Sequence, residues 1–458
     1  LVRNAAFAVT TQHPVYGIRN RHTNERHSTM VRGFLCVIVM VLVPAEVVSR
    51  VAEAGETGAE PITVSEKDWP WWRGPNHNGV AAAGQNPPLV WNDAKNMHFK
   101  VSLPGRGHGS PTVVADNIYL ATADEKMQIQ SVLCFDRRNA KRKWKTELHR
   151  GGFVFKNKKA SLASSTVACD GKRLYINFFN HGAVFTTALD LDGKQLWRTK
   201  ISGYVPHQGF ASSPSIYKSL VLVSADNKGG GALAALDRAT GKIVWRNERP
   251  KTPNYPSPIV HKIGGRDQLL MTGCQLVSSY DPLTGKKNWE IAGSTTECVT
   301  SIVTDGQLVF TSGGYPRNHV SAVRADGSGK VVWENNVRVY VPSMLVQDGY
   351  IYAVTDAGVA TCWKSDTGKQ RWQGRLGGVF SSSPVLVGEK IFATNESGKT
   401  FIFKASPKRF DLLGMNQLGD EVFATPAICG SRIYMRIAEY KDERRQESLC
   451  CIAREDKP

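Results

Sequence analysis

The chain has 458 residues, of which 41% are hydrophobic and 21% charged, with 42 Gly and 22 Pro. This is the composition of a globular, turn-rich protein, and it excludes a disordered, collagen-like or many-span membrane protein. Lys and Arg outnumber Asp and Glu by 58 to 40, and the resulting formal charge of +18 favours anionic partners without naming a function.

The amino-terminal residues have the pattern of a leader in two parts. Residues 1–29 carry several Arg and His and no apolar periodicity, and we interpret them as an extension upstream of a true start at Met30. Residues 30–54 are typical of a secretory signal peptide, because a short basic stretch precedes the apolar run Phe34–Val43 and small residues end at Ala54. That run is too short to span a bilayer. We therefore expect export to the periplasm or outside the cell; the alternative is that the run forms a buried strand.

One eleven-residue pattern recurs along the rest of the chain. Its full copies are Ala235–Trp245, Ser279–Trp289 and Cys362–Trp372, and their common core is Thr-Gly followed by Trp. Degraded copies end at Trp144, Trp197 and Trp333, while Phe99 and Leu412 stand at the aromatic position of two further units. A Ser-Pro signal or a variant of it follows each of the eight positions: Ser110-Pro111, Ser165-Thr166, Ser213-Pro214, Ser257-Pro258, Thr300-Ser301, Pro342-Ser343, Ser383-Pro384 and Thr425-Pro426. Repeats of this length indicate a solenoid or a propeller.

Each unit has the composition of four short strands. β-Branched and aromatic residues alternate in several of them, and Asp-x-x-Thr-Gly-Lys is typical of a tight turn; the clearest expected strands are Val113–Thr122, Leu174–Phe179, Leu220–Ala225, Leu308–Ser312 and Ile351–Thr355. Four strands per unit predict an all-β fold, an eight-bladed β-propeller of four-stranded antiparallel blades.

The ends of the chain predict how this ring closes. The final unit stops before any outer strand, and an unpaired outer strand around Met97–Leu103 precedes the first Ser-Pro signal. We expect these two ends to pair in one hybrid blade, which closes the propeller over residues 94–458. Residues 55–93, with Trp69-Pro70-Trp71-Trp72-Arg73-Gly74-Pro75, are expected to pack against the outside of the ring.

The repeat resembles that of the pyrroloquinoline-quinone (PQQ) repeat propellers, over nearly all of the chain after the leader. The resemblance implies that the outer-strand aromatics dock neighbouring blades and are structural rather than platforms for a ligand. These residues are Phe99, Trp144, Trp197, Trp245, Trp289, Trp333 and Trp372.

The resemblance implies two classes of function. Quinoprotein dehydrogenases of this family bind PQQ and Ca²⁺ in the central funnel, use an Asp as base and commonly place a disulfide between adjacent cysteines against the cofactor. The other class, related to the outer-membrane-assembly propeller, is noncatalytic, and the Trp-Trp-Arg-Gly-Pro opening resembles exported members of it. Cys450 and Cys451 are candidates for this disulfide between adjacent cysteines. However, Cys451 falls at the small-residue position of the repeat, which favours packing within a strand.

Candidate binding residues gather on the rim where outer-to-inner connections meet the loops between second and third strands. They are Arg106, His108, Lys156, Lys159, His207, Tyr255, Arg317 and Tyr340. The set is basic, whereas Ca²⁺ prefers several carboxylate or amide oxygens, for which the rim offers Glu297, Glu396 and Asn227. No zinc spacing, nucleophile elbow or phosphate loop is present in the sequence.

These observations favour an exported, noncatalytic binding scaffold with no catalytic residue, metal or cofactor. Its expected partner is a protein or peptide, or an anionic glycan, and export argues against nucleic acid. We expect a monomer that does not span a membrane. The alternatives are a periplasmic PQQ- and Ca²⁺-dependent dehydrogenase of an alcohol or sugar, and a glycan-binding propeller.

Overall fold

The computed structural model describes residues 60–154 and 157–454, and every regular element in these ranges is a β-strand. The predicted extension and signal peptide, residues 1–29 and 30–54, lie outside the described residues, as does Lys156. Among the described residues no helix is long and apolar enough to cross a membrane.

The strands form eight antiparallel sheets of four strands, which we number I to VIII in chain order. Sheet I consists of β2 (Thr112–Val114), β3 (Asn117–Asp124), β4 (Ile129–Asp136) and β5 (Arg142–Arg150), and sheet II of β6 (Ala168–Cys169), β7 (Arg173–Asn180), β8 (Ala183–Asp190) and β9 (Gln195–Gly203). Sheet III consists of β10 (Ser215–Tyr217), β11 (Leu220–Ser224), β12 (Gly231–Asp237) and β13 (Ile243–Arg249), and sheet IV of β14 (Ile259–Ile263), β15 (Arg266–Gly273), β16 (Leu276–Tyr280) and β17 (Lys287–Ala292).

Sheets V to VIII complete the series. Sheet V consists of β18 (Val303–Thr304), β19 (Leu308–Gly313), β20 (His319–Arg324) and β21 (Val331–Asn335), and sheet VI of β22 (Leu345–Gln347), β23 (Tyr350–Val354), β24 (Val359–Lys364) and β25 (Gln370–Arg375). Sheet VII consists of β26 (Val385–Val387), β27 (Lys390–Thr394), β28 (Lys399–Lys404) and β29 (Leu412–Gln417), and sheet VIII of β30 (Ala427–Cys429), β31 (Arg432–Lys441), β32 (Arg444–Ile452) and β1 (Met97–Leu103).

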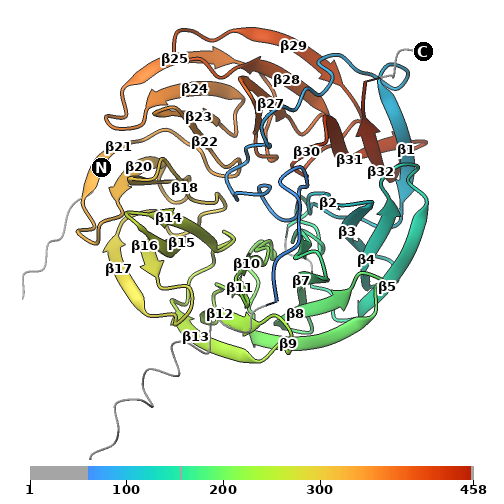
Figure 1. The fold of residues 1–458 in the computed structure, drawn as a ribbon, viewed down its shortest axis with the longest axis horizontal. Helices are drawn as coiled ribbons and strands as arrows, with labels where there is room; N and C mark the ends of the chain where they lie inside the picture. Colours follow the sequence, from blue (N-terminus) through green and yellow to red (C-terminus); the bar gives the residue numbers. More distant parts are fainter. Residues whose placement is uncertain (1–59, 155–156, 455–458) are drawn as a thin grey trace, which may run out of the picture. The chain divides into compact units, whose positions relative to one another are not determined.

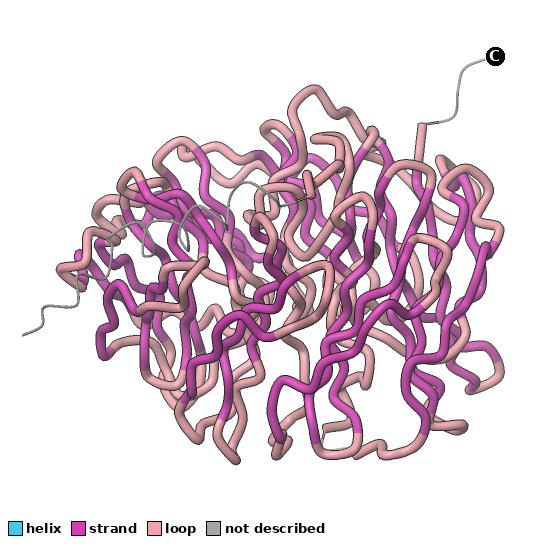
Figure 2. The backbone as a smooth tube through the Cα atoms, turned by 60° about the horizontal axis from the view of Figure 1, so that its bottom comes forward, coloured by secondary structure: helices cyan, strands magenta, loops and turns pink. Residues whose placement is uncertain are grey.

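The eight sheets stand around a common axis, with the first strand of each sheet innermost (Figures 1 and 2). Sheet VIII takes three strands from the carboxyl end and its outermost strand, β1, from the amino end, with Val101 opposite Leu449. The predicted eight-bladed propeller and its closure by Met97–Leu103 are therefore confirmed. One predicted strand is wrong in extent: Val113–Thr122 is divided by a turn at Ala115, whose φ is +48°.

The outer-strand tryptophans join neighbouring sheets. Trp245 of β13 donates its indole N–H to the Pro282 carbonyl, in the turn of the next sheet, at 3.0 Å. Its ring lies against Gly285 of that turn, where a Cβ would come within 2.6 Å of the indole and where φ is +71°. The Thr-Gly turn and the Trp of the repeat thus form one contact between adjacent sheets. Equivalent indole-to-carbonyl bonds are made by Trp144, Trp197, Trp333 and Trp372.

Sheet VII departs from this scheme, and the assignment of Leu412 to the Trp position is wrong. Each outer strand has a bulge just before the aromatic position. In sheet VI the bulge precedes Trp372, which then lies opposite Cys362 of the neighbouring strand. In sheet VII the register places Gly414 there, opposite Ile402, because the preceding turn is longer. The amino-terminal segment fills this place: the backbone N–H of Trp91 donates to Asn416 Oδ1 at 2.8 Å, and the buried Trp91 ring stacks on Phe392.

The Ser-Pro signal corresponds to a chain of hydrogen bonds around the axis. The backbone N–H of Thr166 donates to Ser213 Oγ at 2.9 Å, and that of Ser213 donates to Ser257 Oγ at 2.8 Å. A hydroxyl is required here because it accepts the N–H of the preceding sheet. The same step joins Ser110 to Thr166, Ser301 to Ser343, Ser343 to Ser383 and Ser383 to Thr425.

The prediction that the segment before the ring packs on its outside holds only near Trp91, which contacts the outer strand β29. The part from Trp69 to Val80 crosses the axis instead. It crosses the face of the ring that carries the Thr-Gly turns. It begins where Trp69 pairs with Val113 of β2 and ends where Val80 pairs with Leu386 of β26. Figure 1 shows this segment, in blue, crossing the centre of the ring. The reason is Trp69, Trp72 and the buried Arg73, which bond to an innermost strand or to the connections that lead into the innermost strands.

Candidate functional site: a blind central funnel

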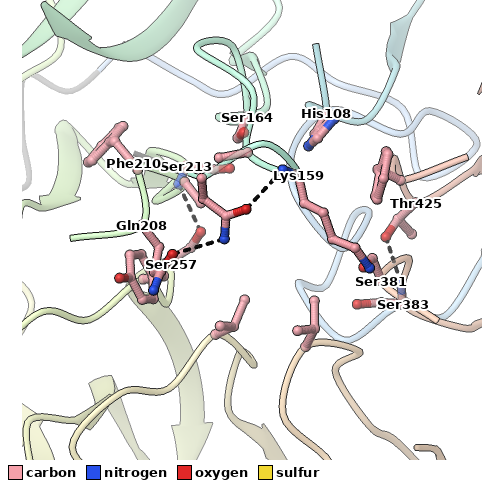
Figure 3. Close-up of a pocket in the computed structure, with 18 of the residues that line it drawn as sticks. His108, Lys159, Ser164, Gln208, Phe210, Ser213, Ser257, Ser381, Ser383 and Thr425 are labelled. Carbon is pink, nitrogen blue, oxygen red and sulfur yellow. Dashed lines mark hydrogen bonds between the residues drawn. The ribbon is translucent and has the colours of Figure 1, made fainter. Parts of the chain in front are cut away.

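The face opposite the turns carries a cavity of about 410 Å³ on the propeller axis. Its walls are the connections that bring the chain from one outer strand to the next inner strand, so several sheets contribute (Figure 3). Trp72 of the amino-terminal segment lines it from below and donates its indole N–H to Ser301 Oγ at 2.8 Å. The cavity therefore has a tryptophan floor and one mouth.

Hydroxyl groups form a lower ring in the cavity. Ser213, Ser257, Ser383 and Thr425 line it, and each hydroxyl oxygen accepts a backbone N–H from the preceding sheet. None of the four hydroxyl hydrogens has an acceptor among the described residues, so each hydroxyl keeps an unused donor.

Aromatic side chains line the wall above the hydroxyl ring. His108 stacks on Phe423 with ring centroids 4.4 Å apart. Burial, and then the charges of nearby arginines led by Arg106, lower the pKa of His108 well below its ordinary value, so the ring is neutral at pH 7. Its Nε2 has no hydrogen-bond partner among the described residues. Tyr255 and Tyr340 line the cavity on the other side, and burial raises the pKa of both phenols.

The mouth is crossed by one charged side chain. Lys159, from the connection between sheets I and II, reaches Glu396 of sheet VII, with Nζ 2.8 Å from Oε2. Ser381 donates a further hydrogen bond to Glu396 Oε1 at 2.7 Å. Beside this arm, the Asn157 amide donates to Gln208 Oε1 at 2.9 Å. Figure 3 shows Lys159 extending over the opening toward Ser381.

The sequence placed eight binding candidates on this rim, and the structure brings four of them to the cavity: His108, Lys159, Tyr255 and Tyr340. His207 lies beside them through Glu297, since its Nε2 is 3.1 Å from Glu297 Oε1 while the Tyr340 hydroxyl is 3.4 Å from Oε2. The remaining described candidates do not line it. Arg106 donates to the Lys158 carbonyl, and Arg317, in the loop before β20, pairs with Glu334 of the outer strand β21.

The oxygen ligands named for Ca²⁺ do not fit such a site. Glu396 is held by Lys159, and Glu297 lies between His207 and Tyr340. Asn227 closes its own turn, with Oδ1 accepting the N–H groups of Val205 and Gly229. Among the described residues no three His, Cys, Asp or Glu side chains come together as a metal would require. Cys450 and Cys451 are separate, buried thiols in β32.

Three aromatic residues of the cavity were not among the sequence candidates: Trp72, Phe210 and Phe423. Trp72 stood in a noticed motif, but that motif was assigned to the outside of the ring. Phe423 and Phe210 precede Thr425 and Ser213 by two and three residues, so the hydroxyl position of each repeat was a usable signal for residues that face the axis.

Comparison with known proteins decides the family. The PQQ-repeat family described as "Outer membrane protein assembly factor BamB" matches residues 128–346 and 316–406, more than half of the chain. The chain belongs to this family. Among curated members, the outer membrane protein assembly factor BamB of Moranella endobia is 23% identical over 71% of this chain and 82% of its own length. A polyvinylalcohol dehydrogenase of a Pseudomonas species is 26% identical over 60% of this chain, which covers 42% of that enzyme.

Solved structures of this family and of dehydrogenases share the fold. BamB from Moraxella catarrhalis superposes with a TM-score of 0.54 at 13% identity, covering 77% of this chain and 96% of its own. A europium-containing methanol dehydrogenase superposes with a TM-score of 0.62 at 12% identity, covering 82% of this chain and 90% of its own. At such identities these likenesses concern the fold alone, and they fit both functional classes of PQQ-repeat propellers.

Proposed function

We propose that this PQQ-repeat protein is an exported binding scaffold that takes its partner into the central funnel and catalyses no reaction there. One observation carries the proposal: Glu396 Oε2 lies 2.8 Å from Lys159 Nζ, and Glu297 lies between His207 Nε2 and the Tyr340 hydroxyl. These contacts argue against either carboxylate as a catalytic base or a Ca²⁺ ligand, whereas aromatic walls and hydroxyls are typical of binding pockets.

The relatives support the exported location and the scaffold role. The relatives named outer membrane protein assembly factors match most of the propeller, and such a factor acts at the cell envelope. A noncatalytic role for this chain is our inference from the funnel. We extend the same inference to the cofactor: the purified protein needs neither PQQ nor Ca²⁺ to bind its partner.

Titration of the purified protein with PQQ and Ca²⁺ by calorimetry tests this proposal. We expect no saturable heat and no quinone absorbance retained after gel filtration, because the funnel lacks a free carboxylate set. Saturable uptake of PQQ, together with reduction of a dye when an alcohol or sugar is added, would establish the dehydrogenase instead.

The dehydrogenase is the second candidate because a polyvinylalcohol dehydrogenase is among the relatives. The Glu396→Gln variant addresses it directly. An enzyme that used Glu396 for Ca²⁺ or for proton abstraction would lose PQQ-dependent turnover, whereas a binding scaffold has no turnover to lose. In the scaffold the variant removes the ion pair with Lys159 and changes the group that accepts the Ser381 hydroxyl.

A further inference from the structure

We propose that the funnel is a blind pocket for the uncharged end of a carbohydrate chain. This inference rests on the proposed binding function and adds the chemical class of the ligand. Three properties carry it: the funnel is closed at its floor, its lining has no unpaired charge, and its polar groups are hydroxyl, amide and imidazole groups set among aromatic rings.

The closed floor selects the end of a chain rather than its middle. Trp72 is fixed by its bond to Ser301 Oγ, and the guanidinium of the neighbouring Arg73 donates to the Met344 and Pro384 carbonyls of two sheets. Further along, the Ala81 N–H donates to the Leu386 carbonyl at 2.8 Å. The amino-terminal segment therefore closes the axis, and a polymer cannot pass through the ring.

The absence of unpaired charge selects a neutral end. Lys159 is the only Lys, Arg, Asp or Glu among the lining residues, and Glu396 already neutralises it. His108 is neutral because it is buried. A peptide terminus carries an ammonium or a carboxylate, and placing either charge in this lining would cost its hydration without a partner. A neutral sugar residue carries only hydroxyl, amide and ether groups.

The polar groups match sugar hydroxyls. Ser213, Ser257, Ser383 and Thr425 present four hydroxyl hydrogens without acceptors among the described residues. An apolar side chain in the funnel would leave these donors buried and unpaired, which costs free energy, whereas sugar oxygens accept them. The rings of the wall and floor offer flat apolar surfaces to the C–H faces of a pyranose.

Calorimetry with linear oligosaccharides tests the inference. The probes are neutral glucose, mannose, galactose and N-acetylglucosamine chains of several lengths, an acidic hyaluronan oligosaccharide, and an N-acetylated peptide amide ending in Trp. We expect saturable binding of at least one neutral chain and much weaker binding of hyaluronan and the peptide. The stoichiometry should stay at one protein per chain as the chain grows, because only the end enters.

Variants locate the binding. Tyr340→Ala and Gln208→Ala remove a wall ring and a rim amide, and each should weaken binding of the neutral chain roughly tenfold or more. Tyr440→Ala is the matched control, since Tyr440 is 51% exposed on β31 and does not line the funnel. Circular dichroism and the melting temperature verify that each variant is folded.

Other outcomes overturn the assignment in distinguishable ways. Preference for the peptide or hyaluronan, lost in Tyr340→Ala, would refute the neutral sugar and keep the binding scaffold. Stoichiometry that rises with chain length would refute end binding. Failure of every neutral chain to bind, or binding unchanged in both funnel variants, refutes the carbohydrate pocket, whereas uptake and turnover of PQQ would refute the scaffold itself.

Discussion

Trp289 shows how the contact between sheets is kept when its usual partner is out of reach. The other five tryptophans donate to a carbonyl in the next sheet, but Trp289 donates to Gln268 Oε1 of its own sheet at 3.0 Å. Gln268 Nε2 then donates to the Ala325 carbonyl of sheet V at 3.0 Å. The turn at Ala325 is one residue longer than that of the full copies. The amide of Gln268 therefore bridges the gap.

We predict that Gln268→Leu lowers the free energy of unfolding by roughly 2–4 kcal/mol, because it leaves the Trp289 indole N–H and the Ala325 carbonyl without partners in a buried place. Gln268 is fully buried and its oxygen also accepts the Ser279 hydroxyl. Urea denaturation followed by tryptophan fluorescence measures the change. Gln370→Leu on the exposed part of β25 is the control and should leave the midpoint unchanged.

The ordinary docking contact is tested by Trp245→Ala. Loss of the ring and of its bond to the Pro282 carbonyl should cost roughly 3–5 kcal/mol, as for other large aromatic truncations. Trp245→Phe keeps most of the ring and should recover much of this loss. Equal midpoints for the Ala variant and the parent protein would contradict a docking role.

At the scale of elements, the amino-terminal segment is the part that the sequence described least well. It carries two histidine contacts on the axis: His77 stacks on Trp71 with centroids 5.0 Å apart, and its Nε2 lies 3.4 Å from Ser215 Oγ. Burial, and then the nearby His261, lower the pKa of His77 to about 3; burial also lowers that of His261 to about 4, with Arg73 adding to the effect.

Acid should therefore weaken the seating of this segment. At a pH between the ordinary histidine pKa and the lowered one, His77 binds a proton in the unfolded chain but not in the folded chain. The free energy of unfolding therefore falls as the pH drops from about 6.5 toward 4. His77→Phe keeps a stacking ring and removes the titration. Between pH 7 and 4, the free energy of unfolding should decrease less for this variant than for the parent protein. We expect the two decreases to differ by roughly 3 kcal/mol.

Denaturation midpoints at a series of pH values measure this difference. His98→Phe, on the exposed outer strand β1, is the control and should retain the parental pH dependence. Identical pH profiles for His77→Phe and the parent protein would show that His77 is not held neutral on the axis.

The elements that the sequence predicted well are those governed by local rules. The Thr-Gly turn requires a positive φ, as at Gly285. The small residue opposite the outer-strand aromatic, as at Ala235 or Cys451, follows from the strand register. The failures concern contacts that no local pattern encodes. Gly414 occupies a Trp position because Trp91, more than 300 residues earlier, fills the space, and Trp72 forms the funnel floor because the segment crosses the axis.

At the scale of the whole molecule, stability depends on the closure of sheet VIII by the two ends of the chain. In β1 and β32, Ser102 lies directly opposite Ser448 and Lys100 opposite Cys450. Every other sheet is continuous in sequence. Separation of this one strand pair would open the ring and expose the edge of β32 to pairing with other chains.

A disulfide across the closure should therefore stabilise the whole propeller. Cβ atoms of directly opposed residues in antiparallel strands lie close to the separation that a disulfide needs, so Ser102→Cys combined with Ser448→Cys should form the bond on oxidation. We expect a higher melting temperature for the oxidised double variant than for its reduced form, with a gain of up to about 4–5 kcal/mol from the long closed loop. The Ser102→Cys single variant should show no such redox dependence. If the oxidised and reduced forms melt together although the bond is verified by mass spectrometry, opening at sheet VIII is not the step that limits the stability of the ring.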